Sequence, residues 1–118
     1  MSGSLMILVA GPYRSGTDGD PERIQANVDA MTAASLEVYR RGHLPVMGEW
    51  FALPLIERAQ AEGDENADVA IFHPVAERVL GRCDACLRIG GPSEGADRMV
   101  RRARELDKTI FTDISEIP

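Results

Sequence analysis

The sequence has little of what marks membrane, nucleic-acid-binding or disulfide-rich proteins. Its longest apolar run near the N-terminus, residues 5–10, is far shorter than the roughly 20 residues of a spanning helix and lacks the basic segment of a signal peptide. Only two cysteines, two histidines and one tryptophan occur among 118 residues. The 13 basic residues are interspersed with 19 acidic ones, so no basic stripe is present that would bind a phosphate backbone. We therefore expect a cytoplasmic protein that binds neither membranes nor nucleic acid.

The two cysteines, Cys83 and Cys86, form a C-x-x-C pair, a spacing found at redox and metal sites. Reactive pairs sit at helix N-termini, where the helix dipole lowers the thiol pKa, whereas these two flank the start of a predicted strand. Residues three apart on a strand point to opposite faces. A zinc site would need two more ligands, and His43 and His73 are not at ligand spacing. We expect buried structural thiols and neither a metal nor another cofactor.

What the chain does have is the alternation of an α/β protein. Its length and its 44% hydrophobic and 27% charged residues are those of a single soluble domain, residues 1–118. Asp20 and Pro21 indicate the start of a long helix that ends near Gly42. Strands are predicted at residues 5–10, 44–47, 84–89 and 109–112. Further helices are predicted at residues 52–61 and 96–106. Residues 68–72 and 75–80 also read as helical, with a break between them at His73-Pro74.

The alternation predicts a doubly wound, flavodoxin-like or Rossmann-like fold with a mainly parallel sheet of about four strands. The continuous apolar run at 5–10 is typical of a central strand buried on both faces, whereas Pro45 confines residues 44–47 to an edge. The expected strand order is 2-1-3-4. In this arrangement the strand order reverses between the first and third strands. Parallel α/β sheets bind their ligands at such a point.

Two glycine-punctuated loops, residues 11–16 and 90–95, follow those two strands and are the best site candidates. The first loop offers the phenol of Tyr13, the guanidinium of Arg14 and the hydroxyl of Ser15. Ser93 in the second loop can cap the following helix and also leave backbone N–H groups free for a phosphate or carboxylate. Together the loops can hold a sugar or a phosphate.

Several further residues admit both a structural and a functional interpretation. The negative charge of Asp97 is favourable in a first helical turn because of the helix dipole, and Glu94 can simply face water. Alternatively, either carboxylate can act on a ligand in the crevice between the loops. Glu49, just after the second strand, can bind a ribose hydroxyl. Trp50 beside it can stack on a base, although a single tryptophan is more often part of a core or a subunit interface.

Five short motifs resemble the nucleoside 2-deoxyribosyltransferase-like superfamily, in particular its small uncharacterised bacterial branch, and they cover nearly the whole chain. They are Gly11-Pro12-Tyr13 with Ser15-Gly16, Asn27 in the first helix, Gly42-His43, Cys83-Asp84-Ala85, and Gly91-x-Ser93-x-Gly95-Ala96.

The resemblance implies cleavage or transfer at an N-glycosidic bond, with a carboxylate that attacks or stabilises the anomeric carbon. It also implies homo-oligomers whose sites are completed by a neighbouring subunit. The family glutamate lies four residues before a small residue, here Ala103, and that position is Met99. Asp97, Glu94 and Tyr13 are then the candidate catalytic residues. The candidate substrate-binding residues are Gly11, Pro12, Arg14, Ser15, Gly16, Glu49, Trp50, Gly91, Ser93 and Gly95.

Three hypotheses follow. The first is an enzyme of nucleoside or nucleotide metabolism, a hydrolase or transferase acting at the N-glycosidic bond. The second is a non-catalytic nucleotide-binding module of the same fold, which the methionine at position 99 favours. The third, a C-x-x-C redox protein, requires exposed thiols that lie near each other.

Overall fold

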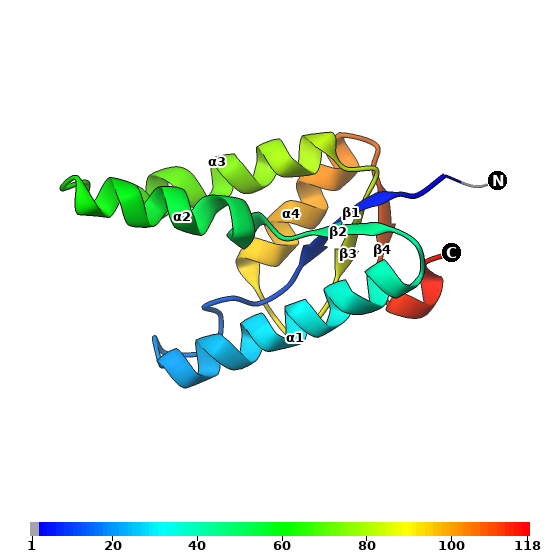
Figure 1. Cartoon of the computed structure of the whole chain (residues 1–118), viewed down its shortest axis with the longest axis horizontal. Coiled ribbons are helices and arrows are strands. Elements are labelled where there is room, and N and C mark those ends of the chain that lie inside the picture. Colours follow the sequence, from blue (N-terminus) through cyan, green and yellow to red (C-terminus); the bar gives the residue numbers. More distant parts are fainter. Residues whose placement is uncertain (1–2) are drawn as a thin grey trace.

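The computed structural model describes residues 3–118 and is built on a parallel sheet of four strands. The strands are β1 (Met6–Ala10), β2 (Leu44–Val46), β3 (Ala85–Arg88) and β4 (Thr109–Phe111), in the order β2-β1-β3-β4 (Figure 1). In the register, Leu8 of β1 lies between Val46 of β2 and Cys86 of β3. The predicted doubly wound fold, its strand order and the central place of the first strand are confirmed.

Helices cover both faces of the sheet (Figure 1). Helix α1 (Pro21–Arg40) and the short 3-10 helix η1 (Ile114–Glu116) lie on one side, and α3 (Ala67–Arg82) and α4 (Glu94–Glu105) lie on the other. Helix α2 (Gly48–Ala61) pairs with α3 in a hairpin that extends beyond the sheet (Figure 1). Within the described residues no helix is long and apolar enough to cross a membrane.

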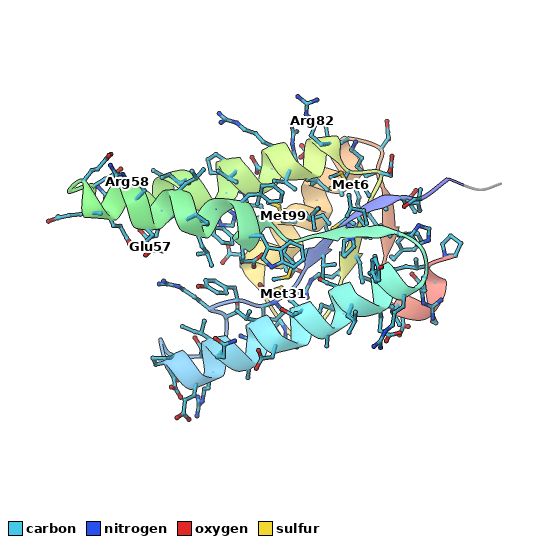
Figure 2. The ribbon with its side chains drawn as sticks, in the orientation of Figure 1. Met6, Met31, Glu57, Arg58, Arg82 and Met99 are labelled. Atoms are coloured by element: carbon cyan, nitrogen blue, oxygen red, sulfur yellow. The ribbon has the colours of Figure 1, made fainter. Side chains whose placement is uncertain are left out.

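Alternate residues of β1 supply the two main cores. Ile7 and Val9 face α1 with Met31 and Val38, whereas Leu8 and Ala10 face α3 and α4 in a second cluster that includes Met99. Figure 2 shows Met31 and Met99 in the interior and Glu57, Arg58 and Arg82 at the surface. This two-sided burial is the reason that residues 5–10 are continuously apolar.

Helix α1 begins as the sequence indicates. The Asp20 side chain accepts a hydrogen bond from the Glu22 N–H group at 3.1 Å, and Pro21 occupies the first helical position, where its missing N–H group costs nothing. The helix ends at Arg40, and Gly42 follows it with a φ of +93°. Glycine tolerates this left-handed conformation without steric cost.

The expected break at His73-Pro74 is wrong, because α3 runs through both residues as one helix. Phe72 and Val75 pack against α2, while Ala76 and Leu80 pack against the sheet. Apolar contacts on both sides of the proline therefore offset the hydrogen bond that its nitrogen cannot donate.

Two other expectations need correction. Helix α2 starts at Gly48 rather than residue 52, so Glu49 and Trp50 belong to its first turn. Cys83 ends α3 instead of lying on a strand, so the two cysteines do not face opposite sides of the sheet. Cys83 and Cys86 share one apolar cluster and are buried, as expected of structural thiols.

Candidate functional site

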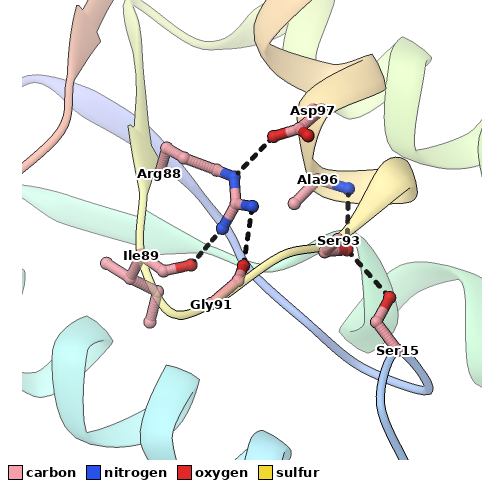
Figure 3. Close-up of polar contacts among 7 residues, drawn as sticks. All are labelled: Ser15, Arg88, Ile89, Gly91, Ser93, Ala96 and Asp97. Atoms are coloured by element: carbon pink, nitrogen blue, oxygen red, sulfur yellow. Dashed lines mark hydrogen bonds and ion pairs between the residues drawn. The ribbon is translucent and has the colours of Figure 1, made fainter.

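The two glycine loops meet at the carboxyl ends of β1 and β3. The Ile89 N–H group donates to the Ala10 carbonyl at 2.9 Å, which continues the strand pairing into the loops. Further on, the Ser15 hydroxyl donates to the Ser93 hydroxyl at 3.1 Å (Figure 3). These contacts confirm the prediction that the loops open into one crevice.

Glycine is required where the loops approach most closely. A Cβ atom at Gly11 would lie 3.0 Å from Cγ1 and 3.1 Å from the carbonyl oxygen of Ile89. Gly90 has a φ of +80°, and a Cβ atom there would lie 2.6 Å from Cδ of Pro12. The glycines therefore allow one loop to pack directly on the other.

Ser93 joins the loops to α4. Its hydroxyl accepts a hydrogen bond from the Ala96 N–H group at 3.2 Å, so Ser93 is the helix N-cap that the sequence predicted (Figure 3). The first loop is anchored separately, because the Asn27 side chain donates to the Tyr13 carbonyl at 2.9 Å and the Thr17 hydroxyl donates to that of Arg14 at 2.6 Å. The loop backbone is thus held in place from α1 and from within the loop.

A cavity of about 410 Å³ opens beside the joined loops and is also lined by residues of the α2–α3 hairpin. Seven of the predicted site residues line it: Gly11, Tyr13, Arg14, Ser15, Glu49, Ser93 and Gly95. The lining that was not predicted comes mainly from the hairpin, including Leu53, Ile56, Asp68, Phe72 and His73. Pro12, Gly16, Trp50, Gly91, Glu94 and Asp97 are not among the lining residues.

Aromatic side chains from the first glycine loop and from α3 meet in the cavity lining. The ring of Phe72 stacks on that of Tyr13 with centroids 6.1 Å apart, and His73 meets Phe72 edge-on at 5.5 Å. The Arg14 guanidinium lies 5.9 Å from the centre of the Tyr13 ring. Sequence reasoning missed Phe72 and His73, because a helical pattern does not tell which turn of α3 faces the glycine loops.

Burial shifts the pKa of two ionisable side chains of the cavity. Glu49 is only 8% exposed, and burial raises the pKa of its carboxyl, opposed by a hydrogen bond from its own backbone. Burial lowers the pKa of His73, with a further lowering from Arg98 and an opposing effect from Glu77. The His73 Nδ1 atom is buried and, within the described chain, has no hydrogen-bond partner. Burial therefore disfavours the charged form of each group relative to a group exposed to water.

Asp97 points away from the cavity and pairs with Arg88. The Arg88 Nε atom lies 3.1 Å from the Asp97 carboxylate, and the same guanidinium donates to the carbonyls of Ile89 and, at 2.8 Å, Gly91 (Figure 3). Asp97 thus holds the arginine that braces the second glycine loop. Because its side chain is 57% exposed, we ascribe little stability to the pair itself.

The other candidates divide between surface and interior. Glu94 is exposed at the start of α4, and Trp50 is 47% exposed on α2. Met99 is 5% exposed and belongs both to the apolar core and to the cavity wall. Where the structure describes the chain, no group of three or more potential ligands could hold a metal ion.

No protein-family model matches the sequence, and no curated protein matches it either.

Proposed function

We propose that the protein binds a nucleoside or nucleoside monophosphate in this cavity and cleaves or transfers its N-glycosidic bond. The observation that carries the proposal is a cavity of about 410 Å³ lined by the stacked rings of Tyr13 and Phe72, by hydroxyls and a guanidinium, and by the buried carboxyl of Glu49. This volume is within the range of small-molecule sites, and apolar linings with a few polar groups are typical of them.

The lining suits the parts of a nucleotide. The Phe72 and Tyr13 rings offer flat apolar surface to a base. Ser15, Ser93 and Arg14 lie at the joined loops and offer hydroxyls and a positive charge to a sugar or phosphate. The resemblance to the nucleoside 2-deoxyribosyltransferase-like superfamily supports the same class of ligand.

A second candidate function is a nucleotide-binding module without catalysis. Met99 favours it, because an apolar side chain occupies the position where the resemblance implies a glutamate. Asp97 is paired with Arg88, and Glu94 is exposed outside the lining, so neither replaces that glutamate in the cavity.

Homo-oligomerisation belongs to the same proposal. The projecting α2–α3 hairpin, which also lines the cavity, carries four exposed apolar side chains, those of Trp50, Phe51, Leu55 and Val69. Apolar surface of this kind is typical of subunit interfaces. We expect an oligomer by light scattering at micromolar concentration, and a monomer there would contradict this part of the proposal.

The experiment is incubation with a panel of nucleosides and 5′-monophosphates. Free base is followed by chromatography, and melting temperature is recorded in parallel because ligands that bind the native state raise it. Base release supports the enzyme, a melting shift without turnover supports the binding module, and neither response refutes both.

A matched pair of variants locates the response. Phe72→Leu removes a ring from the cavity wall, whereas Phe51→Leu removes an exposed ring from the same hairpin outside the lining. We expect the first variant to weaken the melting shift and the second to preserve it. Equal effects would place the ligand elsewhere.

A further inference from the structure

Glu49 is set apart from the other acidic side chains by where α2 begins. It is the second residue of that helix, directly after the edge strand β2, and it lines the cavity with Leu53 and Ile56 of the same helix. Only 8% of its surface is exposed. The structure thus places one carboxyl group inside an otherwise largely apolar part of the cavity.

Asp68, the other carboxylate among the described lining residues, has a different environment. It is partly exposed, and its side chain accepts a hydrogen bond at 2.9 Å from the neighbouring Val69 N–H group. Glu49 has no such bond from another residue and no ion pair with a basic side chain in the described part of the chain. A buried carboxyl without a cation retains its proton more readily than an exposed or paired one.

We propose that Glu49 is the general acid of the reaction, donating its proton to a ring nitrogen of the leaving base. This inference rests on the proposed N-glycosidic activity and adds to it the catalytic group and the outcome. Carboxyl groups held in apolar pockets serve as acids in glycosidases in the same way.

The step balances with water as the second reactant. The bond between C1′ and the base nitrogen breaks, its electron pair stays on the nitrogen, and that base takes up the Glu49 proton. A water oxygen then bonds to C1′ and releases a proton that returns to the Glu49 carboxylate. The sum is nucleoside plus water giving free base plus free sugar, so hydrolysis is the expected outcome.

Met99 is consistent with this route. Protonation of the base makes it a better leaving group, so that water can serve as the nucleophile and no carboxylate is needed at position 99. A site with a buried acid at Glu49 and no nucleophile at position 99 can therefore still hydrolyse the bond.

The test compares two leaving groups. Glu49→Gln keeps the shape of the side chain but cannot donate the proton. Glu57→Gln, at an exposed position of the same helix outside the cavity lining, is the matched carboxylate control. The substrates are a purine nucleoside and 4-nitrophenyl riboside, whose phenolate leaves without a proton. We expect Glu49→Gln to lower base release by about 10²- to 10⁴-fold and to preserve nitrophenolate release, while Glu57→Gln preserves both.

The pH profile supplies a readout that a purely structural role would not change. The wild-type kcat should fall as pH rises through the raised pKa of Glu49, and Glu49→Gln should lose this limb. Tyr13 and Arg14 line the cavity from the first loop, and Asp68 and His73 from α3. If the titration of Glu49 causes the fall of kcat with pH, a His73→Gln variant must still show that fall.

Each result bears on the inference separately from the proposed function. Undiminished base release by Glu49→Gln, or equal losses on both substrates, would overturn the acid role while the N-glycosidic activity stands. No cleavage of either substrate by the wild type would refute both. If Glu49→Gln does not fold, Glu49→Met, which buries no polar group, serves the same comparison.

Discussion

Replacement of Met99 by glutamate tests whether the cavity is a family site with one residue exchanged. Met99 is 5% exposed and packs in the cluster that contains Leu8, Ala76 and Ala103. Full burial of a methionine contributes about 1.5–3 kcal/mol, of which the glutamate methylenes retain part, so the apolar loss is about 1 kcal/mol. Burial of a neutral carboxyl adds about 1–3 kcal/mol. We expect Met99→Glu to lower the free energy of unfolding by about 2–4 kcal/mol at acidic pH.

The loss should grow with pH. Burial raises the pKa of the new carboxyl in the folded state, and each unit of that rise costs about 1.4 kcal/mol once the group ionises in the unfolded chain. The assay is urea unfolding at pH 5 and pH 8, with Met99→Gln and Met99→Leu as controls for polarity and shape. Wild-type stability of Met99→Glu at both pH values would show that this side chain opens to water and would refute the core assignment. A gain of base release would show that the position still belongs to a catalytic site.

Three further outcomes are expected. Gly90→Ala should destabilise the fold by about 2–5 kcal/mol in urea unfolding, from the left-handed φ and the contact with the other loop, whereas Gly91→Ala, with nothing within 4 Å, should be nearly neutral. Because folding raises the pKa of Glu49, the free energy of unfolding of the wild type should fall as pH rises from about 4.5 through the pKa of the folded state. The same fall in Glu49→Gln would contradict this expectation. Burial raises the pKa of Cys83 to about 11 and that of Cys86 to about 12. Iodoacetamide at pH 8 should therefore modify both thiols in urea but neither thiol in the native protein, and rapid labelling of the native protein would show that the thiols are reactive.

Local patterns determined the layers and the order of the sheet. The apolar run at 5–10, Pro45 and the capping residues Asp20 and Ser93 each act within a few positions, so strand, edge and helix starts could be predicted from them. Right-handed crossovers then brought the two glycine loops to one end of the sheet, as the Ser15–Ser93 contact confirms.

Only the tertiary structure decided which side chains enter the cavity. Asp97 and Met99 lie on one turn of α4, yet Asp97 turns outward to Arg88 while Met99 turns inward, because the helix packs with its apolar face on the sheet. The α2–α3 hairpin brings Phe72 to Tyr13 across a long separation in sequence. Glu49 is buried because α2 begins directly after β2, which places its first turn against the cavity that the loops also line. Periodicity reveals which face of a helix is apolar, but the burial and charge state of a carboxyl depend on the neighbours that distant segments supply.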